Sequence, residues 1–199
     1  LERLNPDFDV CAEAMPSMAA VEGKLAGVYV RALRVGFVGE LGYELHCLSS
    51  LAASLWDDLM AAGADLNIEP FGVEAQRVLR LEKGHIIVGQ DTDGLSTPPE
   101  ADMAWAIAKS KPFYVGKAAV DALNKDGSAR RLVGFALKPG DPLPKECHLV
   151  IDGPDIVGRV TSISDSPALG HPIGLAVMRP DLAEVGETLK IRTDGGALG

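Results

Sequence analysis

Two glutamates, Glu40 and Glu44, stand in a glycine-rich stretch whose chemistry suits recognition of a nitrogen heterocycle. Residues 34–44 read Arg-Val-Gly-Phe-Val-Gly-Glu-Leu-Gly-Tyr-Glu, with glycines at positions 36, 39 and 42. Glycine suits places where the backbone takes a positive φ or approaches another group closely. A carboxylate at the end of such a strand can accept hydrogen bonds from heterocyclic N–H groups. The alternative is a β-hairpin with a long turn and two solvated glutamates.

Apolar runs on either side of this stretch predict the strands that position it. Residues 28–35 lead in and residues 43–48 lead out. Before them, residues 15–25 predict a short helix with Ser17 as its cap. After them, apolar residues at helical spacing predict helices over 51–63, capped by Ser49 or Ser50, and over 73–83. Strands followed by helices indicate an α+β fold rather than repeating βαβ units.

A polar turn cluster at residues 89–94 follows a short β-like run at residues 85–88. The cluster contains Asp91 and Asp93, but its spacing does not match an EF-hand loop, so we predict no metal site. Aspartates in such turns usually close the turn, and we assign neither of them a catalytic role. A short helix is predicted at residues 118–123.

A polar segment at residues 124–128 predicts a boundary between two domains, residues 1–125 and residues 129–199. Beyond it lie five short β-like runs, at residues 131–137, 147–151, 156–162, 173–178 and 188–192. Turn residues separate these runs at short intervals. This spacing is typical of a small all-β barrel or sandwich.

Composition limits the possible partners. The 199 residues carry a net charge of −9, which argues against nucleic-acid and anionic-membrane partners. Uncharged apolar runs are far shorter than the roughly 20 residues that span a bilayer, and we see no signal peptide. Three cysteines, Cys11, Cys47 and Cys147, fit neither a disulfide framework nor a metal site. We therefore expect reduced, buried thiols in a cytoplasmic protein.

Four motifs in order resemble the aminomethyltransferase family, which contains the glycine cleavage T-protein. Residues 36–44 resemble the family's Gly-Tyr-Thr-Gly-Glu-Asp-Gly-Phe-Glu, and this variant is closer to the copy in the alpha subunit of heterotetrameric sarcosine oxidase. Residues 79–84 resemble Leu-Arg-Leu-Glu-Ala-Gly. Residues 89–93 with Thr97-Pro98 resemble Gly-Gln-Asp-Met-Asp followed by Thr-Pro, and residues 113–117 resemble Asp-Phe-Val-Gly-Lys. Together the four motifs are far more specific than any one of them.

The resemblance implies a fold and a folate site. The fold would be α+β: the second half of the folate-binding module, with a ferredoxin-like α/β sheet, followed by a small all-β barrel. Glu44 would bind the pterin ring of tetrahydrofolate, and Phe37 would pack beside it in place of the motif's tyrosine, without its hydroxyl. Gln76 stands where the family has an arginine near the folate, so Arg77 or Arg80 is the possible substitute. Arg80 matches another family arginine, which we expect to be structural.

The resemblance also implies what lies outside these residues. The T-protein's catalytic aspartate lies upstream of its folate-binding glutamate, so no catalytic residue is assigned, and we expect the isolated fragment to be inactive. The leading interpretation is a fragment of a sarcosine oxidase alpha subunit, an oxidoreductase whose FAD, NAD and FMN, and whose other subunits, lie outside this chain. Its partners would be folate and a small amine. One alternative is a stand-alone aminomethyltransferase or a dimethylglycine-oxidase-like enzyme. Another is a non-catalytic folate-binding scaffold, which the lack of a cysteine beside Lys83-Gly84-His85 disfavours.

Overall fold

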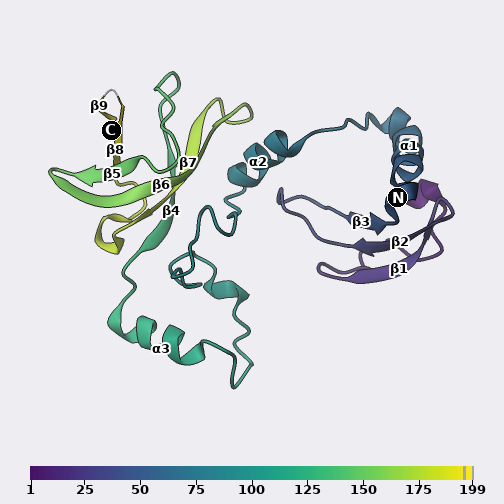
Figure 1. Cartoon of the computed structure of the whole chain (residues 1–199), viewed down its shortest axis with the longest axis horizontal. Coiled ribbons are helices and arrows are strands. Elements are labelled where there is room, and N and C mark those ends of the chain that lie inside the picture. The colour runs from purple at the N-terminus through teal and green to yellow at the C-terminus, as the bar shows by residue number, and fades with distance from the viewer. Residues whose placement is uncertain (195, 199) are drawn as a thin grey trace. The chain divides into compact units, whose positions relative to one another are not determined.

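The computed structural model describes residues 1–194 and 196–198, and it divides into two compact units. Unit 1 is Leu1–Leu79 and unit 2 is Arg80–Gly199. Figure 1 shows one antiparallel sheet in each unit, labelled β1–β3 and β4–β9. One helix, α2 (Val73–Glu82), runs across the division. Helices together with antiparallel sheets confirm the predicted α+β class.

Unit 1 is a three-stranded sheet with a helix on one face. Its strands are β1 (Ala20–Leu25), β2 (Val28–Leu33) and β3 (Glu44–Cys47), in the order β1-β2-β3. A 3-10 turn, Ser49–Leu51, leads from β3 into α1 (Ala52–Gly63), and further 3-10 turns cover Glu2–Leu4 and Ala64–Leu66. The helix after β3 is therefore confirmed, although neither Ser49 nor Ser50 supplies a side-chain cap.

The core of unit 1 follows from strict alternation along β2. Val28, Val30 and Ala32 are buried, while the residues between them face away. Val28 and Val30 pack with Leu25 of β1 and with Leu55 of α1, so the helix covers that face of the sheet. Alternate residues therefore lie on the opposite face, which α1 does not cover.

The helix predicted at residues 15–25 is wrong. Residues 20–25 form β1, whose six residues pair in register with β2 from Ala20↔Leu33 to Leu25↔Val28. A turn closed by the Met15 N–H and the Cys11 carbonyl precedes it. Pairing with β2 gives backbone groups of β1 cross-strand partners, and Leu25 is buried, which together outweigh a weak local helical pattern.

Unit 2 is built on a six-stranded antiparallel sheet in the order β4-β7-β6-β5-β8-β9. Its strands are β4 (Arg131–Ala136), β5 (Leu149–Asp152), β6 (Asp155–Ser166), β7 (His171–Met178), β8 (Lys190–Thr193) and β9 (Gly196–Leu198). Helix α3 (Lys117–Asp126) and 3-10 turns at Ala104–Ala106 and Pro180–Leu182 complete it. All five predicted β-runs and both predicted helices, at residues 73–83 and 118–123, are confirmed.

Two further expectations for unit 2 have different outcomes. The β-like run at residues 85–88 is not a strand, because the Ile87 carbonyl accepts hydrogen bonds from Gln90 and Asp91 in a turn instead. The domain boundary after residue 125 stays a prediction. Helix α3 continues through Asp126, inside the polar segment from which that boundary was inferred.

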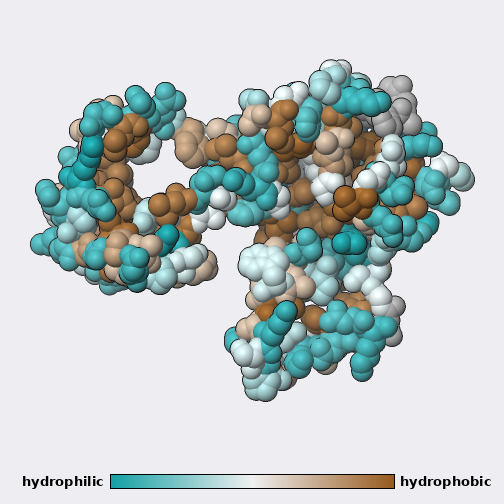
Figure 2. Space-filling model, turned by 180° about the vertical axis from the view of Figure 1, so that it is seen from behind, coloured by the Kyte–Doolittle hydropathy of each residue, from teal (hydrophilic) through white to brown (hydrophobic). Residues whose placement is uncertain are grey.

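The surface mixes polar and apolar side chains, as Figure 2 shows. The exposed apolar group in unit 2 includes Val88, Leu95, Trp105, Phe113 and Val115. The cysteines also differ from expectation. All three are free thiols, but Cys11 and Cys47 are only half-buried and Cys147 is exposed.

Candidate functional site

The turn between β2 and β3 is so compact that it leaves no room for a side chain at two of its glycines. A Cβ on Gly42 would lie 2.6 Å from the Val35 carbonyl oxygen, and one on Gly36 would lie 2.6 Å from the Glu40 carbonyl oxygen. Gly39, at the tip, has φ +79°, which favours glycine. The turn therefore folds back on itself and delivers Glu44 at the first position of β3.

Two side chains tie this turn to the N-terminal segment. The Tyr43 hydroxyl donates to the Val10 carbonyl at 3.0 Å, and Arg34 Nη1 donates to the Met15 carbonyl at 2.5 Å. Met15 is itself buried, so the segment it belongs to is fixed in place. Both ends of the turn are thus anchored outside the sheet, and Glu44 follows directly after one of the anchors.

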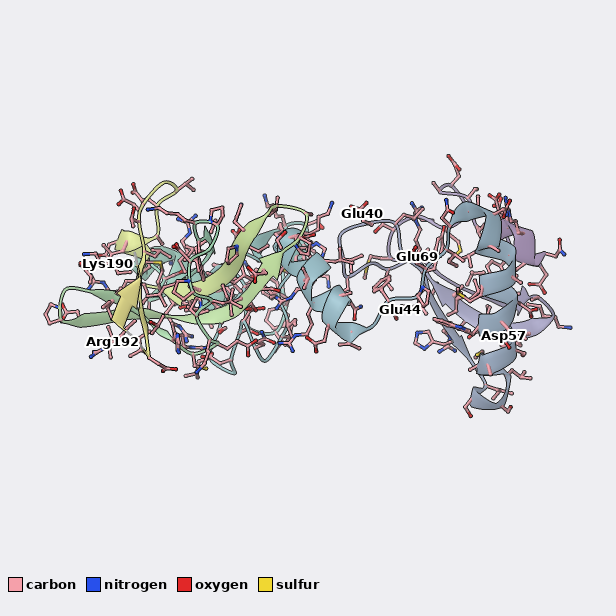
Figure 3. All side chains as sticks on the ribbon, turned by 90° about the horizontal axis from the view of Figure 1, so that it is seen from above. Glu40, Glu44, Asp57, Glu69, Lys190 and Arg192 are labelled. Carbon is pink, nitrogen blue, oxygen red and sulfur yellow. The ribbon has the colours of Figure 1, made fainter. Side chains whose placement is uncertain are left out.

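Glu44 lies on the sheet face that α1 leaves open. It pairs across the strands with Leu33, and His46 pairs with Arg31, whereas the buried Val30 and Ala32 of β2 point to the other face. The Glu44 side chain is 60% exposed. Figure 3 shows Glu40 and Glu44 beside the sheet and Asp57 on α1. A carboxylate placed this way is accessible to a ligand and has spare acceptor capacity.

The other predicted site residues are not hydrogen-bonded to Glu44 in the described part of the chain. Phe37 is half-buried within the turn, while Gln76 and Arg77 are half-buried on α2. Arg77 Nη1 approaches Glu74 Oε1 at 3.8 Å, one helical turn away. In the described residues, no hydrogen bond or ion pair joins Glu44 to any of these three. The structure positions Glu44 at the end of the turn. The roles of Phe37, Gln76 and Arg77 in binding stay predictions.

A second acidic group on the open face is already neutralised. Arg31 Nε donates to Glu22 Oε1 at 2.8 Å, and the Tyr29 hydroxyl donates to Glu22 Oε2 at 2.8 Å. The Arg31 guanidinium, followed by the Tyr29 hydroxyl, lowers the pKa of Glu22. Both oxygens of Glu22 are thus occupied, which distinguishes it from Glu44 on the same sheet.

Asp91, the first aspartate of the polar turn cluster, lies in a closed, buried network in unit 2. Asp91 forms an ion pair with Arg80 at 2.8 Å, and the two side chains are 0% and 2% exposed. The Ser162 hydroxyl donates to Asp91 Oδ1 at 2.6 Å, and the Ile87 N–H donates to Oδ2 at 2.8 Å. Arg80 also donates to Ser162 Oγ at 2.7 Å, and its Nε is buried without a partner. The structural role expected for Arg80 is confirmed. In the sequence, Arg80 belongs to the polar face of the helix predicted at residues 73–83, which we expected to be solvated, and this expectation is wrong because the side chain is buried.

Asp93 also forms a structural ion pair, but its side chain is more exposed than that of Asp91. Arg130 Nη1 donates to Asp93 Oδ2 at 2.9 Å, and the Ser96 hydroxyl donates to Oδ1 at 2.9 Å. The guanidinium of Arg130, together with Ser96 and the Leu95 N–H, holds the pKa of Asp93 far below its usual range. Both aspartates of the turn cluster therefore serve to hold residues 89–96 in place.

Two contributing residues were missed at the level of sequence. His46 lies two positions after Glu44 on a strand, and this spacing is the signal that could have placed the two side chains on one face. Ser162 carries no local signal, because its partner Asp91 lies 71 residues away in the chain. Local patterns report on neighbours, and this contact depends on the tertiary fold.

The described residues also set two limits on the kind of site. Across residues 1–194 and 196–198, no three or more His, Cys, Asp or Glu side chains gather where they could hold a metal ion. Over the same residues, none of the helices has the length and apolar character needed to cross a bilayer.

Comparison with known families identifies the family to which this fold belongs. Residues 1–111 match the family model described as the GCVT N-terminal domain. Residues 130–198 match the model described as the glycine cleavage T-protein C-terminal barrel domain. The protein is thus an α+β protein of the glycine cleavage T-protein type. The chain belongs to the aminomethyltransferase family.

Individual relatives fall into two kinds. An aminomethyltransferase from Halothermothrix orenii is 41% identical over 169 residues, which are 85% of this chain and 47% of that protein. The sarcosine oxidase subunit alpha of Corynebacterium sp. (strain P-1) is 39% identical in an alignment of 207 positions, gaps included, which covers 97% of this chain and 21% of that subunit. The crystal structure of the glycine cleavage system aminomethyltransferase T from Bartonella henselae superposes with a TM-score of 0.77 at 25% identity, over 91% of this chain and 49% of that one. The chain thus spans about half the length of these aminomethyltransferases and about a fifth of the alpha subunit.

Proposed function

We propose that this chain carries the tetrahydrofolate-binding part of an aminomethyltransferase module, with Glu44 as the residue that binds the pterin ring. The observation that carries the proposal is the position of Glu44. It stands at the end of a tightly closed glycine turn, on an open sheet face, with an exposed carboxylate. A carboxylate can accept two parallel charge-assisted hydrogen bonds from a ring edge with adjacent N–H groups.

The fit of the remaining residues is partial. Phe37, in the same turn, supplies an aromatic ring for packing but no hydroxyl. Gln76 and Arg77 on α2 are the polar side chains that we propose to lie near the folate. When bound, tetrahydrofolate supplies the nitrogens that accept a one-carbon unit from an amine. The residues of this chain bind and orient it, and no proton transfer is assigned to them, because Asp91 and Asp93 are both committed to structural ion pairs.

The finer proposal is that the module belongs to a sarcosine oxidase alpha subunit. The match to the two Corynebacterium alpha subunits extends over 97–98% of this chain at 37–39% identity. The full enzyme would then oxidise a small amine using FAD, NAD and FMN held outside these residues, together with other subunits, in the cytoplasm. Its one-carbon product would be captured here as methylene-tetrahydrofolate.

The second candidate is a stand-alone aminomethyltransferase. The 41% identity to the Halothermothrix orenii protein favours it, over a shorter part of this chain. Both candidates use the same Glu44 site, so they differ in the surrounding protein and not in the residues described here. Expression of the native polypeptide, followed by a test for bound flavin, separates them.

Calorimetric titration with tetrahydrofolate tests the shared proposal. We expect saturable binding to the 199-residue chain, weakened by about 1–3 kcal/mol in Glu44→Ala, the value for a lost hydrogen bond to a charged group. The matched control is Asp57→Ala, which removes an exposed carboxylate from α1 in the same unit and should leave affinity unchanged. Equal affinity of the wild type and Glu44→Ala would refute the role of Glu44.

A further inference from the structure

Glu44 has a neighbour on the open face of the sheet that the folate site does not yet include. His46 follows it by two positions on β3, so both side chains emerge from the same side of the sheet. His46 Nε2 lies 3.3 Å from Glu44 Oε2, and each side chain is 60% exposed. The two groups are close enough to form a hydrogen bond while remaining accessible to a ligand.

This contact leaves most of the Glu44 carboxylate available. In the described part of the chain, His46 supplies the one hydrogen bond or ion pair of the Glu44 side chain. A carboxylate has two oxygens with two acceptor sites each. One site on Oε2 faces His46, so Oε1 and the second site on Oε2 can still accept two N–H groups from a ligand.

The arginine opposite His46 is engaged elsewhere. Arg31 is the cross-strand partner of His46. Its Nε donates to Glu22 Oε1 at 2.8 Å, on the strand on the far side of β2 from β3. A free guanidinium at this position would compete with His46 and with a ligand for Glu44. Since Glu22 holds Arg31, the imidazole of His46 is left as the partner of Glu44.

We propose that His46 is a positioning residue, which holds the Glu44 carboxylate ready for a ligand that presents two adjacent N–H groups. The inference rests on the proposed folate site and deepens it. An exposed glutamate samples many rotamers and loses this freedom when a ligand binds, which weakens binding. A hydrogen bond from His46 removes part of that freedom before the ligand arrives. His46 itself makes no contact with the ligand in this proposal.

The first test compares the affinity of tetrahydrofolate for His46→Ala and His46→Gln. We expect the Kd of His46→Ala to be about two- to tenfold higher, because the Glu44 side chain must then be ordered when the ligand binds. Glutamine keeps an N–H donor, so His46→Gln should recover part of the loss. His171→Gln, which changes a histidine in unit 2, is the matched control and should bind like the wild type.

The coupling between the two residues gives a readout that a general loss of structure would not reproduce. In a Glu44→Ala background, His46→Ala should cause no further loss of affinity, because the side chain it positions is gone. A loss that persists in this background would overturn the inference. So would a Glu44→Ala variant that binds weakly beside a His46→Ala variant that binds normally. If Glu44→Ala itself binds normally, the folate proposal fails instead.

A measurement without ligand keeps the inference open to refutation if the chain binds no folate. Ring ¹⁵N NMR of the folded chain should show His46 with a proton on Nε2, and the signal should change in Glu44→Gln while that of His171 does not. A His46 ring spectrum that is unaffected by Glu44→Gln would show that the pairing does not form in solution and would overturn the proposal.

Discussion

The carboxylates of Glu44 and Asp91 stand in opposite environments within one chain. Glu44 is 60% exposed and, among the described residues, has a single partner, at 3.3 Å, which leaves most of its acceptor sites open. The side chain of Asp91 is fully buried and accepts from Arg80, Ile87 and Ser162 at 2.6–2.8 Å. A buried charge is tolerated only when its acceptor sites are filled. Asp91 therefore belongs to the scaffold of unit 2, whereas Glu44 keeps acceptor sites that a ligand can use.

The largest effect should come from breaking the buried pair. Asp91→Ala leaves the Arg80 guanidinium buried without a counter-ion, which we expect to destabilise unit 2 by about 3–5 kcal/mol. Hydrogen exchange followed by mass spectrometry would report on the strands of unit 2 and unit 1 separately.

The control for this prediction is Asp93→Ala, which removes a partly exposed carboxylate two residues away and should cost far less. The double variant Arg80→Met with Asp91→Leu should recover much of the lost stability, because no charge remains buried. Equal protection of unit 2 in Asp91→Ala and the wild type would contradict the structural role assigned to this aspartate.

A smaller effect is expected at the turn that delivers Glu44. Gly42→Ala places a Cβ about 2.6 Å from the Val35 carbonyl oxygen, so the turn must shift. We expect a loss of about 1–3 kcal/mol, as in other overpacked sites, together with weaker folate binding. Chemical denaturation measures the first effect. Gly94→Ala is the control, since a Cβ there meets nothing within 4 Å; similar losses in both variants would show that the turn is not tightly packed.

Acid should reveal the contribution of Asp93. Its pKa in the folded chain is lowered, first by Arg130. A depressed carboxyl pKa stabilises the folded state above the unfolded value, near 3.9, and that stabilisation is lost as the pH falls toward the folded value. The melting temperature of the wild type should therefore drop below about pH 4 more steeply than that of Asp93→Asn. Parallel acid profiles would argue against the ion pair.

The smallest expected effect on stability, at Glu44, is the most direct test of its contrast with Asp91. Glu44→Gln should change the free energy of unfolding by no more than about 0.5 kcal/mol, because an exposed carboxylate contributes little to the fold. Thermal unfolding of the purified variant measures this. A large destabilisation would mean that Glu44, like Asp91, belongs to the scaffold, and would remove the basis for treating it as a ligand-binding group.

The sequence predicted the strands and the turn better than the polar network. Residues 28–35 alternate only in part between apolar and polar side chains, but this β-like run and the glycines at 36, 39 and 42 mark a strand and a turn, so local patterns were sufficient. The helix predicted over the residues of β1 was wrong because pairing with β2, for example Leu33 opposite Ala20, decides their conformation. Position relative to a partner strand is not encoded in a window of ten residues.

The buried network was hidden for the same reason. Arg80 looked like one more charge on a polar helix face, and Asp91 like an ordinary turn residue. Their burial depends on Ser162 of β6, which meets both of them only after the chain has folded. The resemblance to a family supplied the expectation that Arg80 is structural, and the contacts explain why.

The same contacts carry a consequence for the order of folding. The sheet of unit 1 joins residues close in the chain, beginning with a hairpin whose strands are separated only by Ala26 and Gly27. The bond between Arg80 and Ser162 instead closes a loop of 82 residues. Loops of this length close slowly and late, because their entropy must be lost before any contact compensates for it. We expect the strand that bears Glu44 to form early, and the fold to become resistant to unfolding only when β6 seals the arginine from water.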